Sequence, residues 1–355
     1  MTKVELVTSP HKHNRSSVFK KMLIVCLALI PGTVAYIWFF GPAVLIQAAL
    51  SILFALIIEF LILKIRKLEL SLYLFDGSVI VTALIFALMI TPYTPWWISL
   101  IGISFGIIFA KHIYGGLGQN IFNPAAAGYI FVLLCFPVDM NNWPVASGIN
   151  SGDDSSVNYF SIIFSNPLNS NTSSTTSLYA DNAEQLDAVS SATPLADMQN
   201  RIASMDMVSE IRTNPIYSIL AGKGWEWVNI GYLLGGVILL ILGIISWQIP
   251  TAFLGGMFCI SLVFNMYDSE IYASTLFHLF SGGSMLGAFF VATDPVTASI
   301  TPKGKLIYGC LIGILAYIIR IWGAYPEGIA FAILIANSFV PLIDKFTRPR
   351  VIGEN

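Results

Sequence analysis

Long apolar stretches dominate this 355-residue sequence and constrain its fold more than any other feature. A helix needs about 20 apolar residues to cross a bilayer, and backbone at that depth must satisfy its own hydrogen bonds. We identify ten stretches of roughly this length, several of them short or interrupted by glycine: residues 22–40, 43–63, 74–91, 96–111, 121–137, 227–246, 250–266, 271–291, 304–321 and 326–343. The sequence therefore predicts an all-α polytopic membrane protein with about ten transmembrane helices.

Composition supports this class and excludes others. Hydrophobic residues make up 56% of the chain and charged residues 11%, whereas soluble proteins carry about 25% charged residues. A soluble domain of this length could not bury so much apolar surface, which excludes a soluble enzyme and a nucleic-acid-binding protein. The four cysteines (Cys26, Cys135, Cys259 and Cys310) lie far apart in apolar stretches, so we expect neither a disulfide framework nor a bound metal.

Lysine and arginine are unevenly distributed between the loops. Ten spans place both termini on one side, and 14 of the 18 basic residues fall on that side. The four on the other side are Arg201, Arg212, Lys223 and Arg320. Because cytoplasmic loops are enriched in basic residues, we expect both termini to be cytoplasmic and the long loop to face outward, toward the periplasm. We expect membrane lipid as a partner of the spans.

This topology divides the chain into five parts. They are a cytoplasmic N-terminal segment (1–21), a first five-helix membrane repeat (22–137), a periplasmic loop (138–226), a second five-helix membrane repeat (227–343) and a cytoplasmic tail (344–355). An odd number of spans in each half requires that any internal repeat be inverted. Asp76-Gly77-Ser78 opens the third span and Gly282-Gly283-Ser284 lies in the eighth. Inverted repeats with glycine-interrupted spans are typical of transporter-like folds.

Charged side chains at span ends are functional candidates, because charge is expensive at membrane depth. Asp76, Asp294 and Asp344 stand at such positions, and their short carboxylates do not extend easily to water. Carboxylate oxygens near interrupted helices suit a hard monovalent cation. We interpret Glu59 and Arg320 as interfacial residues whose longer side chains extend to water.

The segment from Lys111 to Ala125 is rich in glycine and asparagine and includes Gly115, Gly116 and Asn123. At membrane depth such backbone lines a cavity or is covered by protein, and glycines let a planar ligand approach the main chain. The segment does not match a dinucleotide-binding fingerprint, because a membrane span rather than a strand precedes it.

In the outer loop, Ser190-Ser191-Ala192-Thr193-Pro194 combines small side chains with hydroxyl groups. The proline biases Thr193 toward extended backbone, which leaves its hydroxyl accessible to a modifying enzyme. An ordinary turn with a cluster of hydroxyl residues is the simpler interpretation of these residues taken alone.

Several motifs, taken in order along the chain, resemble one family. They are Ser190–Ala196, Lys111–Ala127, Ala292–Ala298, Thr301–Gly304, Arg320–Gly328 and Val340–Arg350. On these motifs and the ten-span frame, the chain resembles the family that contains the RnfD subunit of the Rnf (Rsx) ion-translocating electron-transport complex. It is similar, more distantly, to the NqrB subunit of the sodium-pumping NADH:quinone reductase.

The resemblance implies that FMN is joined through its phosphate to Thr193 by a separate flavin transferase. Ser190, Ser191 and Ala192 complete the attachment motif. The chain departs from the family pattern at Ser191, where glycine is frequent, but serine is also small. The resemblance further implies a second, non-covalent flavin such as riboflavin, which we expect near Gly115, Gly116 and Asn123.

The resemblance also implies a redox relay in the bacterial inner membrane. Electrons from reduced ferredoxin or NADH would pass through iron–sulfur subunits and a periplasm-facing flavoprotein subunit, and their transfer would drive sodium ions or protons through the membrane part. Asp294 and Asp344 match acidic positions of the related reductase subunit and are the expected ion path, with Asp76 as a third candidate.

Two other functions agree with the membrane architecture. A small-solute channel or permease with an inverted-repeat fold and no flavin would explain the spans equally well. A structural scaffold that only docks partners is the third possibility. Covalently bound flavin distinguishes the redox subunit from the channel or permease. The scaffold predicts instead that the outer loop can lose Thr193 without loss of function.

Overall fold

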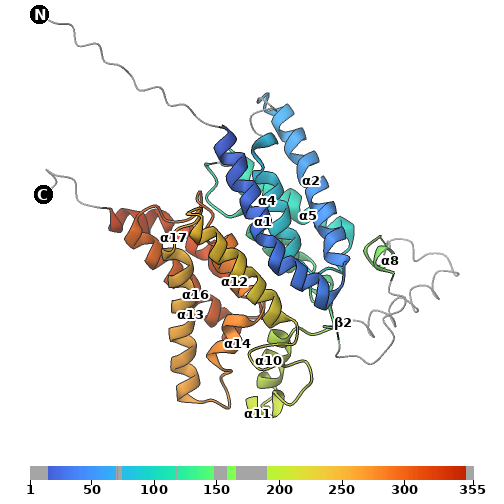
Figure 1. The fold of residues 1–355 in the computed structure, drawn as a ribbon, viewed down its shortest axis with the longest axis vertical. Coiled ribbons are helices and arrows are strands. Elements are labelled where there is room, and N and C mark those ends of the chain that lie inside the picture. The colour runs from blue at the N-terminus through green and yellow to red at the C-terminus, as the bar shows by residue number, and fades with distance from the viewer. Residues whose placement is uncertain are drawn as a thin grey trace, which may run out of the picture.

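The computed structural model describes residues 15–68, 70, 74–116, 118–147, 158–164 and 190–348. Most of the expected N-terminal segment, the end of the expected C-terminal tail and the middle of the expected periplasmic loop lie outside the described residues. The described part is almost entirely helical and falls into two helical halves (Figure 1).

The first half corresponds to the first five expected spans. Its elements are α1 (Arg15–Phe40), α2 (Ala43–Ile65), the short 3₁₀ helix η1 (Leu74–Asp76), α4 (Ser78–Met89), α5 (Trp96–Phe105) with its π-helical continuation η2 (Gly106–His112), and α6 (Pro124–Cys135). α1 contains Pro31 but runs without interruption. The expected third span begins later than predicted, because Gly77 takes a left-handed conformation (φ +80°) before α4.

The second half holds the other five expected spans. Its elements are α12 (Trp225–Ile241), α13 (Gln248–Tyr267), α14 (Thr275–Phe280), α15 (Ser284–Leu286) with the π-helix η4 (Gly287–Val291), α16 (Pro302–Trp322) and α17 (Ile329–Thr347). The expected eighth span is therefore broken, since Ser281–Gly283 separates α14 from α15.

Short elements of the expected outer loop connect the two halves. They are α7 (Pro137–Met140), strand β1 (Trp143–Pro144), α8 (Tyr159–Phe164), strand β2 (Ser190–Ser191), α10 (Pro194–Ala203) and α11 (Val208–Ile211). β1 and β2 pair antiparallel, with Trp143 opposite Ser191. This pairing ties the segment that precedes Thr193 to the end of the first half.

Helix starts follow a local sequence rule. Asn123, Thr193 and Thr301 each precede a proline, and each side-chain oxygen accepts a hydrogen bond from a backbone N–H in the first turn of the helix. A capping oxygen satisfies an otherwise unpaired donor, and proline tolerates the first helical position because its missing N–H would have no partner there. These X–Pro pairs therefore act as helix start signals.

Five described helices are long and apolar enough to cross a membrane: α1 from Val18, α2, α13, α16 and α17. Four shorter apolar helices (Ser78–Met89, Trp96–His112, Pro124–Cys135 and Trp225–Ile241) accompany them. The prediction of an all-helical polytopic membrane protein is confirmed. The count of ten spans and the inverted repeat stay predictions.

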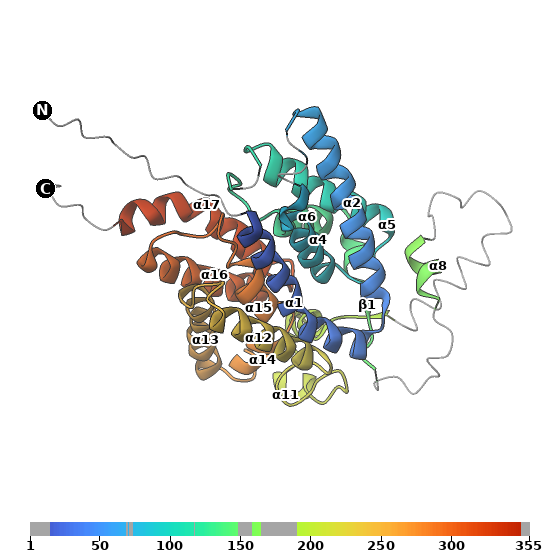
Figure 2. The same ribbon diagram turned by 45° about the horizontal axis from the view of Figure 1, so that its top comes forward.

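The two halves pack through matching helices. α1, the first helix of the first half, packs along α12 (Figures 1 and 2). α6 packs against α17. α1 begins and α17 ends toward one end of the bundle, whereas α10 and α11 lie at the opposite end (Figure 1). We call these the terminal end and the loop end.

Small residues let the helices approach closely. A Cβ on Gly231 of α12 would lie 2.6 Å from the Cα of Gly32 in α1, and one on Gly313 of α16 would lie 2.1 Å from the carbonyl oxygen of Phe253 in α13. Close backbone contact through glycine pairs spaced four apart drives helix association where lipid is as apolar as the side chains. Gly102–Gly106, Gly231–Gly235 and Gly309–Gly313 have this spacing.

Candidate functional site

Thr193 lies at the loop end, at the point where β2 gives way to α10. Its backbone is extended (φ −64°, ψ 154°), and its Oγ1 accepts a hydrogen bond from the Ala196 N–H at 3.2 Å. Thr193 is half-buried and the preceding Ala192 is exposed. Ser190 and Ser191 form β2, and their side chains lie outside what the structure describes. The expected attachment residue is thus the N-cap of a helix.

Thr193 lines a cavity between the two halves, which we call the Thr193 cavity. Aromatic side chains from α1, α12 and the β1 strand form much of its wall: Tyr36, Trp143, Trp225 and Tyr232. These rings also pack on one another, with 5.2 Å between the ring centroids of Trp143 and Trp225. Gly282, Gly283 and Glu327 line the same cavity. It therefore offers flat apolar walls and one carboxylate.

Helix α10 is held in place from the α11–α12 connection. The hydroxyl of Tyr217 donates a hydrogen bond to Oδ2 of Asp197 at 2.8 Å and contacts the carbonyl oxygen of Pro194 at 3.3 Å. Leu195 and Met198 pack into a small core with Ile211 and Phe277. Burial, and secondly the hydrogen bond to Asp197, raise the pKa of Tyr217 above its ordinary value. Position and orientation of Thr193 follow from this anchoring.

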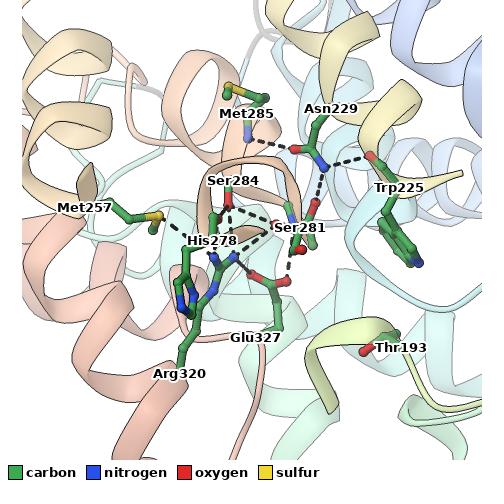
Figure 3. Close-up of polar contacts among 12 residues, drawn as sticks. Thr193, Trp225, Asn229, Met257, His278, Ser281, Ser284, Met285, Arg320 and Glu327 are labelled. Carbon is green, nitrogen blue, oxygen red and sulfur yellow. Dashed lines mark hydrogen bonds and ion pairs between the residues drawn. The ribbon is translucent and has the colours of Figure 1, made fainter. Parts of the chain in front are cut away.

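A buried guanidinium organises the break in the eighth span (Figure 3). Arg320, in the last turn of α16, donates hydrogen bonds to the carbonyl oxygens of His278 at 2.6 Å and Ser281 at 3.3 Å and to Oγ of Ser284 at 3.0 Å. It also pairs with Oε1 of Glu327 at 3.2 Å. Only 1% of its side chain is exposed. The interpretation of Arg320 as an interfacial residue is wrong, because its donors satisfy carbonyl groups that the helix break leaves unpaired.

Asn229 and Gly282 complete this break. The Asn229 amide donates to the carbonyl oxygens of Phe280 and Gly282, both at 2.9 Å, and its Oδ1 accepts from the Met285 N–H at 3.1 Å (Figure 3). Gly282 has φ +58°, and a Cβ there would lie 1.8 Å from Oε2 of Glu327. The turn therefore requires glycine for conformation and for space.

A second buried ion cluster lies in the first half. Glu59 of α2 pairs through Oε1 with Lys111 Nζ at 2.9 Å and through Oε2 with His112 Nε2 at 2.8 Å. Glu59 is 1% exposed, so its interpretation as an interfacial residue is wrong as well. Lys111 on η2 compensates its charge and His112 on η2 shares a hydrogen bond with it, which removes the need to reach water. Arg66 contacts Nδ1 of His112 at 3.2 Å.

The two clusters occupy corresponding positions in the two halves. Lys111 lies at the end of η2, in the fourth expected span of the first half, and donates to Oγ of Ser78, which opens α4, at 3.4 Å. Arg320 lies in the last turn of α16, in the fourth expected span of the second half, and donates to Oγ of Ser284, which opens α15, at 3.0 Å. These are the two serines that the sequence comparison of the halves places together. An inverted repeat would produce this match.

Lys111 lines a second cavity, the Lys111 cavity, which also lies between the halves. Its lining includes Lys21 near the start of α1, together with Asn120, Asn123 and Asp294. Asn123 caps α6 and donates to the carbonyl oxygen of Val291 at 3.3 Å, which links the halves. The structure thus brings Asn123 and Asp294 to one cavity.

Gly115 and Gly116 lie beside this region rather than in it. Both have positive φ, +128° and +107°, and Arg66 donates to the carbonyl oxygen of Gly115 at 3.2 Å. Within the described chain, neither is among the residues that line the Lys111 cavity. Their backbone forms the turn that follows η2.

The three candidate aspartates each stabilise a turn. Oδ1 of Asp76 accepts from the N–H and hydroxyl of Ser78, both at 2.8 Å.

Asp294 accepts from the Val296 N–H at 3.3 Å and the Thr297 hydroxyl at 3.1 Å. Asp344 accepts from the Ser299 hydroxyl at 2.5 Å and the Ile300 N–H at 3.2 Å. Asp294 and Asp344 therefore hold the two ends of one connection, between η4 and α16.

Comparison with known proteins gives the chain its family. The model of the NQR2, RnfD, RnfE family matches residues 5–353. The chain belongs to this family. It is 44% identical, over 98% of both chains, to the D subunit of the ion-translocating oxidoreductase complex of Aliivibrio salmonicida (strain LFI1238). It is 44% identical to the protein of that name from Yersinia pseudotuberculosis serotype I (strain IP32953), over 99% of this chain and 98% of the relative.

For this NQR2/RnfD/RnfE family member, sequence reasoning missed several residues at the Thr193 cavity and at the break in the eighth span. Glu327, Asn229 and His278 were not selected, although Glu327 lies within the Arg320–Gly328 motif. A carboxylate seven residues after an arginine gives no sign of pairing, because the helix ends between them at Trp322 and the chain then turns back.

Proposed function

We propose that this chain is the membrane flavoprotein subunit of an ion-translocating oxidoreductase complex and carries FMN on Thr193 as a phosphoester. The family and the names of the relatives support the complex and the membrane setting. One observation supports the flavin assignment. The hydroxyl of Thr193 in the attachment motif lies at the N-terminus of a helix and on the wall of an aromatic cavity.

The residues present fit this group. A phosphate on Oγ1 of Thr193 would stand at the N-terminus of α10, where backbone N–H groups and the helix dipole favour negative charge. The esterified oxygen can still accept from the Ala196 N–H. A Cβ on Gly283 would meet open space, so the main chain there is uncovered toward a ligand. The bound flavin would supply the electron transfer, while the chain supplies orientation and electrostatics.

The Lys111 cavity is the proposed place for ion movement and for a second flavin such as riboflavin. Asp294 and Asn123 line it, and Gly115 and Gly116 lie in the turn next to its Lys111 wall. Asp344 shares with Asp294 the connection between η4 and α16, and Asp76 holds Ser78 beside Lys111. These contacts support a path at the terminal end in which the three carboxylates keep the cavity walls in position.

The proposal includes partner subunits and a location in the cell. The subunit would sit in the bacterial inner membrane with cytoplasmic termini, beside iron–sulfur subunits and a periplasm-facing flavoprotein subunit that exchanges electrons with the Thr193 flavin. A flavin transferase would attach the FMN. Thr193 is the N-cap of α10, and α10 lies at the loop end, away from the start of α1 (Figure 1), which supports attachment on the outer side.

The test is the attachment itself. The whole complex is expressed with its flavin transferase, and the chain is examined for ultraviolet fluorescence after a denaturing gel and by mass spectrometry of the peptide around Thr193. Thr193→Ser should keep the flavin, since it keeps a hydroxyl and the cap. Thr193→Ala should lose it, because a methyl group cannot be esterified.

Loss of a helix cap costs about 1 kcal/mol by itself, so a matched control is needed. Ser274 caps α14 and accepts from the Phe277 N–H at 3.4 Å. Ser274→Ala loses a comparable cap and should stay fluorescent. A fluorescent Thr193→Ala chain would refute the assignment of Thr193 as the attachment residue.

A further inference from the structure

Glu327 is the charged side chain that connects the Thr193 cavity to the interior of the second half. It follows α16 and lines the cavity together with Thr193. Its Oε2 accepts from the Gly283 N–H at 3.1 Å, and its Oε1 contacts the guanidinium of Arg320 at 3.2 Å. With 27% of the side chain exposed, the carboxylate borders the cavity rather than the protein interior.

Arg320 stands behind this carboxylate. Its other oxygen and sulfur partners are uncharged: the carbonyl oxygens of His278 and Ser281, Oγ of Ser284 and Sδ of Met257. Among the described residues, Glu327 is therefore the acidic group in contact with this cation. The pair is polarised, because Glu327 lines the cavity and is 27% exposed, whereas the Arg320 side chain is 1% exposed and is not among the described residues that line it. Figure 3 shows the contact between the two side chains.

We propose that the Glu327–Arg320 pair sets the reduction potential of the flavin on Thr193. This inference rests on the proposed function, because it assigns electrostatic roles around that same attachment site. Adding an electron to a flavin places negative charge in the cavity. The Glu327 carboxylate disfavours the reduced form and the Arg320 guanidinium favours it, and such effects are strong where water is largely excluded. Glu327 and Arg320 are thus tuning residues and need no covalent contact with the flavin.

Substitutions of the two residues should shift the reduction potential of the flavin in opposite directions. Glu327→Gln keeps an acceptor for the Gly283 N–H and removes the negative charge, so the flavin should become easier to reduce. Arg320→Gln removes the positive charge and leaves the carboxylate uncompensated, so the flavin should become harder to reduce. We expect each change to shift the reduction equilibrium by about tenfold, which corresponds to 59 mV for a one-electron step.

The experiment is a spectroelectrochemical titration of the covalent flavin in the purified complex. Glu226→Gln is the matched control, because Glu226 is a buried loop-end carboxylate bonded to Ser218 Oγ at 2.8 Å and is not among the described residues that line the Thr193 cavity. It should shift the potential clearly less than Glu327→Gln does. Structural damage alone would not move the potential in opposite directions in the Glu327 and Arg320 variants.

The outcomes separate the two proposals. A wild-type chain without covalent flavin would refute the proposed function before any titration. Covalent flavin with an unchanged potential in Glu327→Gln, or with shifts of the same sign in Glu327→Gln and Arg320→Gln, would overturn the tuning role alone. If Arg320→Gln does not accumulate, the comparison of Glu327→Gln with Glu226→Gln decides.

Discussion

At the scale of single residues, charges at membrane depth are stabilised by partners rather than by water. Glu59 and Arg320 are almost fully buried, and each is bound by groups that adjacent helices supply. Removing one member of a buried ion pair leaves an unpaired charge in a medium of low dielectric constant. This costs more stability than replacing both members by apolar side chains. The stability of each cluster therefore depends on every charged side chain in it.

Glu59→Gln tests this dependence. It leaves the buried Lys111 ammonium without a counter-charge, and we expect a loss of about 3–5 kcal/mol in stability. The measurement is the apparent Tm of the detergent-solubilised chain. Glu210→Gln, on the exposed face of α11, is the control and should change stability by less than about 0.5 kcal/mol.

A double variant provides the stricter comparison. Glu59→Gln combined with Lys111→Met removes both charges, so it should be more stable than Glu59→Gln alone. Losses that simply add would show that the 2.9 Å contact between Glu59 and Lys111 does not couple the two residues.

Tyr217 gives a pH-dependent prediction outside the membrane spans. Burial and the hydrogen bond to Asp197 raise the pKa of Tyr217 in the folded chain, so the folded state favours its neutral phenol. The stability that this contributes should be complete below the ordinary tyrosine pKa of about 10 and should fall as the pH rises above it. The stability difference between wild type and Tyr217→Phe, followed from pH 7 to pH 11, measures this effect. A difference that grows with pH would contradict it.

At the scale of elements, glycine contacts decide which helices touch. The α1–α12 and α13–α16 pairs approach backbone to backbone at Gly231 and Gly313, and the break before α15 depends on Gly282. A larger side chain at Gly231 or Gly313 would have to move a main chain, and one at Gly282 would collide with the side chains of Glu327 and Leu195. Helix association in this fold is therefore limited by size rather than by hydrophobicity.

Gly231→Leu tests the contact between the two halves. A leucine side chain would collide with Gly32 and Pro31 of α1, and overpacking costs about 1–3 kcal/mol or more. Gly255→Leu in α13 is the control, because a Cβ there meets open space. We expect a lower apparent Tm for Gly231→Leu and little change for Gly255→Leu. Equal values for the two would remove the glycine contact as the reason for the close approach.

At the scale of the whole molecule, the Thr193 cavity and the Lys111 cavity both lie between the two halves and differ in chemistry. The Thr193 cavity has aromatic walls with one carboxylate, and the Lys111 cavity has lysine, asparagine and Asp294. Helices α1, α4, α6 and α12 contribute to both, so the interface between the halves positions both sites.

Sidedness can be measured on the whole chain. In a chain whose four native cysteines are replaced by alanine, Ser204→Cys lies after α10 at the loop end and Lys64→Cys lies near the end of α2; both positions are exposed. With cytoplasmic termini, a membrane-impermeant maleimide should label Ser204→Cys in intact spheroplasts and Lys64→Cys only in inverted vesicles. The reverse pattern would invert the proposed topology.

The sequence by itself determined the class of the protein and the approximate position of its helices. Apolar length and the scarcity of charge force helices in a membrane whatever their packing, and X–Pro pairs such as Thr193-Pro194 mark helix starts through purely local capping. These features depend on neighbours along the chain, which a sequence displays directly.

Only the tertiary structure decided the partners of the buried charges. Glu59 and Lys111 are 52 residues apart, and Asn123 and Val291 are 168 residues apart. Sequence reasoning assigned Glu59 and Arg320 to the interface with water, because an isolated charge has no other way to avoid the cost of burial. Folding supplied a counter-charge or a set of carbonyl groups instead, and with them the carboxylate of Glu327 on the wall of the Thr193 cavity.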